Sequence, residues 1–311
     1  MVRRRPSRGT LVPALIGVVA VAIAVVVVVR NRHQLHDSVH RLGWLTVLES
    51  LALGIAGVFV LVFLWRSVLR GLGVETELPA ASHAFFLSQL GKYLPGSVWP
   101  VVSQMEFGRR RGIARRTMLA ANVITLAISL AVALVIAAVL LPLSSPAALH
   151  RFWWTFLLLP PLLACLHPRA IPAMLDLLFR LLRREPVGQR LTGRSVVEAV
   201  AWAIVSWLFL GLHLFVIIRG LGATGTDSLA AAIGGAAFAV AVGVAFIPAP
   251  AGAGVRDAVL VLTLTPSIGS TSALAAALAS RVLLVVADLV LAAGGAAVPS
   301  GTPRVGLPVS D

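Results

Sequence analysis

The stretch Gly91-Lys92-Tyr93-Leu94-Pro95-Gly96 lies in the middle of an apolar segment that runs from about residue 79 to residue 107. Proline followed by glycine cannot continue a helix, so the segment divides into arms of about 24 Å and about 16 Å. The second arm is too short to cross a hydrocarbon core of about 30 Å. We therefore predict a hairpin that enters the membrane, breaks at Pro95 and Gly96, and returns to its starting side.

A second apolar segment, at about 228–264, is interrupted in the same way. Its break reads Ile247-Pro248-Ala249-Pro250-Ala251-Gly252-Ala253-Gly254-Val255-Arg256-Asp257, with Pro248, Pro250, Gly252 and Gly254 as the helix-breaking residues. The arm after Asp257 is again too short to cross before Pro266. Two broken hairpins that open toward opposite faces are what an inverted repeat produces, and in transporters such breaks mark a substrate site.

The composition places the chain in the membrane. Hydrophobic residues make up 59% and charged residues 12% of the chain, and the mean hydropathy is +0.96, whereas soluble domains carry about 25% charged residues. The fold class that we predict is an all-α polytopic membrane protein with about six full spans and the two re-entrant hairpins. The predicted spans are 11–29, 45–64, 117–141, 152–166, 195–218 and 272–298.

The remaining segments complete the expected domain organisation. A basic tail at 1–10 precedes a single transmembrane domain at 11–298, and a flexible tail follows at 299–311. Within this domain, residues 168–194 repeat apolar side chains at helical spacing beside arginines, which predicts an amphipathic helix on the cytoplasmic surface, with a solvated linker as the alternative.

The arginines predict the orientation. If the first hairpin returns to its own side, 18 basic residues lie on the cytoplasmic side and five outside, as the excess of positive charge on cytoplasmic loops requires. We therefore expect a multi-pass protein of the cell (inner) membrane with a cytoplasmic N-terminus. The basic residues that give the net charge of +14 lie between the apolar segments. This distribution indicates the membrane topology and argues against a nucleic-acid partner.

The two breaks also resemble known signatures. Residues Gly91 to Trp99, followed by the basic run that ends at Arg110-Arg111-Gly112-Ile113, look like the first signature of the lysylphosphatidylglycerol synthase transmembrane (flippase-like) family. Residues Pro250 to Asp257 resemble its second signature, Pro-Gly-Gly-x-Gly-x-Arg-Glu, but Ala251 replaces a glycine and Asp257 a glutamate. The resemblance covers about 12–298. It implies a lipid flippase or transport module, and we expect no synthase activity from this part alone.

The charged residues at membrane depth are the candidate binding site. A phosphate there requires a cation, and lysine supplies a point charge where arginine supplies a planar fork. The chain contains a single lysine and a single tyrosine, which are adjacent, and an ionisable group near the middle of a bilayer costs roughly 2.5–3.5 kcal/mol unless it is paired. We predict that the headgroup is bound by Lys92, Tyr93, Trp99, Arg256, Asp257, Arg281 and Asp288.

Each of these residues also has a purely structural interpretation. Arg256 with Asp257, and Arg281 with Asp288, could be ion pairs that close a kinked bundle, and Lys92 could extend toward the membrane surface. Trp99 could anchor the chain at the interface. Glu106 is expected to be a counter-charge for the neighbouring arginines, and His213 to be hydrogen-bonded within the bundle.

The leading functional hypothesis is translocation of an anionic lipid, or of a polyprenyl-phosphate-linked precursor, between leaflets. The alternative is a non-transporting scaffold that docks a separate synthase or glycosyltransferase through its basic loops. No nucleotide-binding or metalloprotease motif is present in the sequence, so we expect neither an enzyme nor a cofactor or metal. The many alanines and glycines predict close helix packing, either within or between protomers.

Overall fold

The computed structural model describes residues 42–94, 98–144, 149–150, 153–167, 170, 173, 191–225, 227–245, 252 and 254–297. Several predicted features therefore lie outside the described residues. They are the first span at 11–29, both tails, most of the amphipathic helix at 168–194, and the break residues Pro95, Gly96, Pro248 and Pro250.

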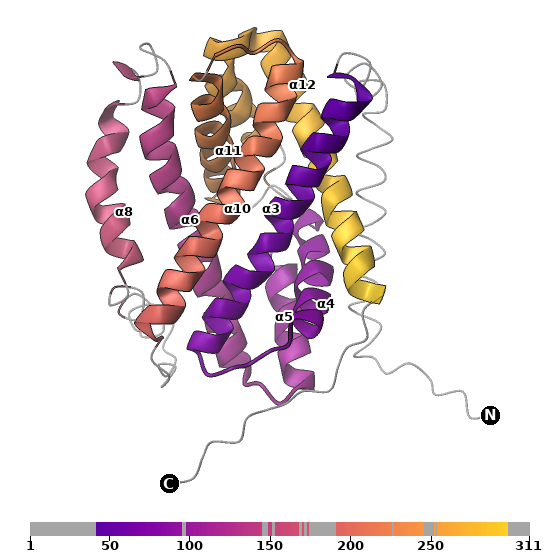
Figure 1. Ribbon diagram of the computed structural model, residues 1–311. Helices are drawn as coiled ribbons and strands as arrows, with labels where there is room; N and C mark the ends of the chain where they lie inside the picture. Colours follow the sequence, from indigo (N-terminus) through magenta and orange to yellow (C-terminus); the bar gives the residue numbers. More distant parts are fainter. Residues whose placement is uncertain are drawn as a thin grey trace, which may run out of the picture.

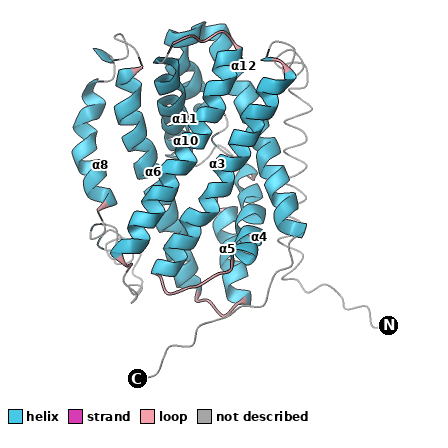
Figure 2. Cartoon of the chain, viewed as in Figure 1, coloured by secondary structure: helices cyan, strands magenta, loops and turns pink. Residues whose placement is uncertain are grey.

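Every regular element of the described residues is a helix (Figures 1 and 2). Along the chain, these are α3 (Trp44–Gly71), α4 (Leu78–Gln89), the 3-10 helix η1 (Leu90–Tyr93), α5 (Trp99–Arg110), α6 (Arg115–Leu143), the 3-10 helix η2 (Trp153–Leu158), α8 (Leu159–Leu166), α10 (Gly193–Gly220), α11 (Asp227–Ala245) and α12 (Val255–Ala297). Within the described ranges, five are long and apolar enough to cross a membrane, namely α3, α6, α10, α11 and α12. The protein is a polytopic all-α membrane protein.

The segment 152–166, which the sequence analysis predicts as a span, forms shorter helices in the structure than the other predicted spans that the structure describes. The structure has the six-residue η2 followed by the eight-residue α8, so this region is not among the five helices of spanning length. Pro160 and Pro161 provide the reason, because proline has no N–H and fits best in the first turn of a helix. They lie in the first turn of α8 and fix its beginning there.

Helices α3 and α10 form an antiparallel pair, which sets the direction of both hairpins. Near one end, the Arg70 side chain on α3 binds Glu198 on α10 at 3.0 Å. In the middle, a Cβ on Gly57 would lie 2.8 Å from Leu210 Cγ, so glycine lets the two helices approach closely. At the other end, Gly220 lies against Thr46. The end of α3 and the end of α10 are therefore at opposite ends of the bundle (Figure 1).

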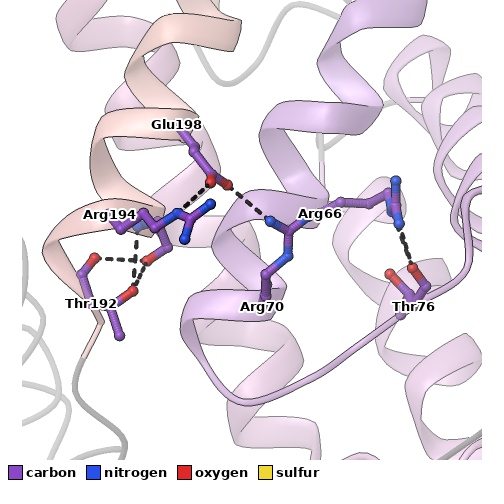
Figure 3. Close-up of polar contacts among 7 residues, drawn as sticks. Arg66, Arg70, Thr76, Thr192, Arg194 and Glu198 are labelled. Carbon is purple, nitrogen blue, oxygen red and sulfur yellow. Dashed lines mark hydrogen bonds and ion pairs between the residues drawn. The ribbon is translucent and has the colours of Figure 1, made fainter.

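Figure 3 shows the polar contacts at the end where α10 begins. Glu198 accepts hydrogen bonds from Arg70 and from Arg194, which lies one turn before it on α10. Thr192 caps α10 by accepting the N–H of Ser195. Arg66 donates twice to the carbonyl oxygen of Thr76, which fixes the loop from α3 to α4. The loop before the first hairpin and the beginning of α10 thus share one end of the molecule.

The first interrupted segment doubles back on itself, as its sequence predicts. Gln104 on α5 donates to Ser88 Oγ on α4 at 2.7 Å. Nearer the break, a Cβ on Gly91 would lie 2.9 Å from the Pro100 nitrogen and from Trp99 Cβ. Residues that follow one another on α4 and η1 therefore meet residues of α5 in reverse order. The two arms are antiparallel, and their open ends lie beside the end of α3 and the beginning of α6.

The second interrupted segment forms a similar antiparallel pair between α11 and the first part of α12. Gly235 lies against Thr263 and Gly243 against Arg256 and Gly252. The segment opens beside the end of α10, which is the opposite end of the bundle from the first hairpin. The two doubled-back segments therefore run in opposite directions within the bundle.

Helix α12 contains a kink that falls within the interval that the sequence analysis left between the second hairpin and the final span. We expected the second hairpin to end before Pro266 and a new span to begin near Ser272. The helix instead continues through Pro266 and bends at Gly269, where φ is 76° and ψ is 159°. The Thr263 and Thr265 hydroxyls donate to carbonyls of the preceding turn. Such a backbone conformation is essentially confined to glycine, so the break falls at Gly269.

Candidate functional site

The part of α12 after its kink lies against the first hairpin. His83 Nδ1 is 2.9 Å from the carbonyl oxygen of Gly295, Leu90 packs with Ala292, and Tyr93 packs with Val285. The contacts move backward along α12 as they move forward along α4 and η1. This antiparallel packing places Lys92 and Tyr93, which end η1 just before the first break, beside the part of α12 that follows its kink.

Asp288 is the residue of α12 that meets this pair. It is only 2% exposed, and its Oδ2 atom lies 2.7 Å from Lys92 Nζ. The Tyr93 hydroxyl donates a hydrogen bond to the same oxygen. The other carboxylate oxygen, Oδ1, is buried without a hydrogen-bond partner among the described residues. Both donors therefore act on a single oxygen of a carboxylate that is almost completely removed from solvent.

Arg281 and Asp257 form the second ion pair of the site. The Arg281 guanidinium donates to Asp257 Oδ2, and this oxygen also accepts the backbone N–H of Gly254 at 3.1 Å. Asp257 therefore caps the first turn of α12 and holds an arginine from the same helix beyond the kink. The two parts of α12 are tied together directly at the second break.

Both ion pairs differ from the structural pairs expected from the sequence. Arg281 does not bind Asp288, because residues seven apart on a helix are separated by about 10.5 Å along its axis. Arg256 does not bind Asp257, because adjacent residues of a helix do not face each other. The partner of Asp288 is Lys92 and the partner of Asp257 is Arg281. The pairs that the structural interpretation named do not form: Lys92 takes the place of Arg281 at Asp288, and Arg281 takes the place of Arg256 at Asp257.

Arg256 is the remaining charged residue of the cluster. It interacts electrostatically with Tyr93, Asp288, Arg281 and Asp257. Its Nε atom is buried without a hydrogen-bond partner, and no ion pair of this side chain is found within the described part of the chain. The residue nevertheless keeps partial exposure. Arg256 thus lies close to both ion pairs, and its Nε–H group is available to bind a further acceptor.

The two breaks are therefore joined through one charged cluster. Lys92 comes from the first hairpin, and Arg256 and Asp257 follow the break of the second, while Arg281 and Asp288 come from the final span. Three cations face two carboxylates, so the described cluster carries one positive charge in excess. An excess charge away from bulk water is costly unless an anion compensates it.

The other predicted site residues lie around this cluster. Trp99 is partly buried at the beginning of α5 and faces Gly91 across the first break. Gly252 and Gly254 have φ values of 68° and 81°, which are the left-handed conformations that glycine adopts readily. Gly252 also lies against the Gly243 backbone, where a Cβ would be 3.0 Å from Gly243 Cα. Glycine is therefore needed at 252 for two separate reasons.

His213 connects three helices near the site, as expected of a hydrogen-bonded histidine in a bundle. Its Nδ1 atom lies 2.7 Å from Ser50 Oγ on α3, and its Nε2 atom lies 3.0 Å from Ser280 Oγ on α12. Both serines are buried, and His213 interacts electrostatically with Arg256. The sequence analysis overlooked Ser50 and Ser280, although an isolated hydroxyl inside an apolar helix is a recognisable signal.

Glu106 is a counter-charge, as predicted. It accepts hydrogen bonds from Arg109 at 2.7 Å and 2.8 Å and from Arg110 at 3.1 Å, all within the last turns of α5. The hydrogen bond from Arg109 is the main reason that the pKa of Glu106 is lowered to about 2. The Glu106 carboxylate is thus occupied by neighbouring arginines at the open end of the hairpin, away from the charged cluster.

Comparison with protein families assigns the chain. A family described as the lysylphosphatidylglycerol synthase TM region matches residues 14–292. No curated protein matches the chain. The family match includes both hairpins and all five charged residues of the cluster, and it confirms the resemblance that the two signatures indicated. The chain therefore belongs to the lysylphosphatidylglycerol synthase transmembrane family.

Proposed function

We propose that the protein binds the phosphate of an anionic lipid, or of a polyprenyl-phosphate-linked precursor, between its two broken hairpins and moves it between the leaflets of the cell membrane. The observation that carries this proposal is Arg256, a cation without an ion-pair partner among the described residues, in a cluster with one excess positive charge. A phosphate would supply the missing negative charge and accept hydrogen bonds from the guanidinium.

The arrangement of the cluster favours a lipid headgroup over a purely structural role. Ion pairs that only close a bundle would be balanced within the protein, whereas this cluster has three cations and two carboxylates. Its members come from two segments that double back from opposite ends of the bundle. In transporters, discontinuous segments of this kind hold the substrate near the midplane. Membership in the family supports a role with membrane lipids.

The proposal includes an orientation. Both hairpins are re-entrant, the first opens toward the cytoplasm, and the N-terminus lies on the same side. The site then lies at membrane depth, where a headgroup can exchange between leaflets without crossing bare hydrocarbon. We do not assign a catalytic reaction to the site, because it binds and releases the lipid unchanged. Docking of a separate synthase or glycosyltransferase is the alternative, and most of the basic segment 168–194 that would mediate it lies outside the described residues.

Reconstitution into liposomes tests the proposal. Vesicles with fluorescent phosphatidylglycerol should show faster transfer between leaflets when they contain the protein than when they are empty. Arg256→Gln removes the free guanidinium, and loss of charge-assisted hydrogen bonds worth about 1.5–3 kcal/mol should slow transfer by roughly 10-fold to 100-fold. Arg219→Gln is the matched control, since Arg219 is exposed at the end of α10 over the Phe215 ring.

Two results would contradict the proposal. One is a transfer rate in protein-containing vesicles that equals the rate in empty vesicles. The other is an unchanged rate in Arg256→Gln, provided that this variant elutes as the wild-type protein does in size-exclusion chromatography. Retained binding of a synthase by a protein that does not transfer lipid would instead favour the scaffold alternative.

A further inference from the structure

Lys92 and Asp288 form an asymmetric ion pair. The Lys92 side chain is 33% exposed, whereas the Asp288 side chain is 1% exposed. Lysine is flexible and its ammonium group can rotate among acceptors, but a short carboxylate buried on a packed helix cannot follow it. A phosphate that arrives at the site would therefore draw Lys92 away and leave Asp288 in place.

Asp288 would then be a buried carboxylate with one remaining donor. The Tyr93 hydroxyl would still bind Oδ2, but Oδ1 has no partner within the described residues to compensate for the lost ammonium group. Removing one partner of a buried ion pair leaves an uncompensated charge that is strongly unfavourable. A carboxyl group in this position relieves the cost by taking up a proton.

The surrounding charges favour protonation at Asp288 over any other group. Asp257, the other carboxylate of the cluster, keeps its Arg281 partner and the Gly254 N–H. Arg256 and Arg281 on α12 stabilise a negative Asp288 as long as no anion is bound, but a phosphate at Arg256 would cancel much of that effect. On the neighbouring helices, His213 of α10 is held between two serines and His83 of α4 binds the Gly295 carbonyl.

We propose that Asp288 is a proton-binding site coupled to the lipid site, so that binding of one phosphate headgroup at Lys92 and Arg256 takes up one proton from solution. This inference rests on the proposed function and adds a source of driving force to it. Lipid and proton bind together and leave together, so a proton gradient would bias the direction of lipid movement. The lipid itself is not altered, and the only bond formed is the O–H bond of Asp288.

Isothermal titration calorimetry of the full chain in detergent tests the coupling. Dihexanoyl phosphatidylglycerol is the probe, with inorganic phosphate in a parallel titration to separate a lipid headgroup from free phosphate. The observed enthalpy is measured at one pH in Tris and in HEPES, which differ in ionisation enthalpy. Its dependence on the buffer gives the number of protons taken up, which should be about one for the wild-type protein.

Two variants make the assignment specific. Asp288→Asn keeps the size of the side chain and should bind the probe with an uptake near zero, whereas Glu198→Gln, which removes a carboxylate outside the cluster, should retain the wild-type uptake. In addition, the wild-type Kd should fall by up to about tenfold for each unit of decrease in pH, and that of Asp288→Asn should not change.

Three outcomes would overturn the inference. Probe binding by the wild-type protein without buffer dependence excludes proton coupling but leaves the proposed function intact. Wild-type uptake in Asp288→Asn assigns the proton to another group. Absence of any binding by the wild-type protein contradicts the proposed function, and the coupling with it. Because the buffer comparison uses the wild-type protein, it tests the proton uptake itself even if a variant fails to fold.

Discussion

At the scale of single residues, the shared acceptor Asp288 Oδ2 is the central feature of the site. Lys92 and Tyr93 are adjacent in the sequence, and both bind this one oxygen. Asp288 itself lies on a helix nearly 200 residues later in the chain. Hydrogen bonds to charged groups are worth about 1.5–3 kcal/mol each, and more is lost when a buried partner is left unsatisfied. Asp288 therefore supplies the polar contacts that hold Lys92 and Tyr93 to the final helix.

Tyr93→Phe should lower the stability of the protein by about 1.5–3 kcal/mol, because it removes a hydroxyl donor to a buried carboxylate without changing the ring. Thermal unfolding in detergent measures the effect. Ser206→Ala is the matched control, since it removes a neutral hydrogen bond to the Gly57 carbonyl at 2.8 Å and should cost only about 1 kcal/mol. A loss in Tyr93→Phe that is no larger than in Ser206→Ala would contradict the importance of the charged acceptor.

The sequence identified these residues but not their partners. Lys92 and Tyr93 could be selected because each is unique in the chain, and Arg256 because it follows a second break. Asp288 was paired with Arg281 in the sequence analysis, since both lie on one face of the same helix. The true partner could not be predicted, because the Lys92–Asp288 distance depends on how two distant segments pack.

At the scale of elements, each hairpin depends on a glycine where its two arms meet. Gly91 faces Trp99 and Pro100, and Gly252 faces the Gly243 backbone, in both cases at distances that exclude a side chain. These contacts involve backbone atoms or a Cβ, which cannot move aside as the end of a flexible side chain can. Close packing of the arms therefore requires glycine at both places.

Gly91→Ala should lower the free energy of unfolding by about 1–3 kcal/mol, because the added Cβ would lie 2.9 Å from the Pro100 nitrogen. Gly294→Ala is the control: Gly294 lies on α12 with no atom within 4 Å of an added Cβ, so this change should be neutral or slightly stabilising. Thermal unfolding of both variants gives the comparison. Equal melting temperatures for the two would mean that the arms do not meet at Gly91.

The positions of the two hairpin breaks follow directly from the sequence, whereas the bend in α12 could be placed only to within a few residues. Paired prolines and glycines interrupt an apolar run visibly, and the two doubled-back segments follow from them. Pro266 suggested the end of the second hairpin, but a single proline can be accommodated within a membrane helix, and the helix continues a few residues beyond it. The backbone breaks at Gly269, which lies between Pro266 and the predicted beginning of the next span at Ser272.

At the scale of the whole molecule, the direction of the two hairpins follows from the antiparallel contact between α3 and α10. The first hairpin begins after α3, and the second begins after α10. Because these two helices run in opposite directions, their following segments enter the bundle from opposite ends (Figure 1). The distribution of arginines predicts the direction of the first hairpin by an independent argument, because it concerns the loops and not the helix contacts.

Cysteine labelling tests this arrangement in the membrane. In a Cys165→Ser background, Arg115→Cys marks the end of the bundle where the first hairpin opens, and Thr224→Cys marks the opposite end; both positions are exposed. A membrane-impermeant maleimide added to intact spheroplasts should label Thr224→Cys and spare Arg115→Cys until the cells are lysed. Labelling of both positions in intact spheroplasts would contradict the proposed orientation.

The isolated lysine also makes the site unusually easy to follow by chemistry. An amine-selective acylating reagent has a single side-chain target in this protein, and that target is Lys92. Its nitrogen lies 2.7 Å from Asp288 Oδ2, and its side chain is 33% exposed. The rate at which one peptide gains the mass of the reagent would therefore report, in the unmodified protein, how accessible this amine is before and after a lipid is added.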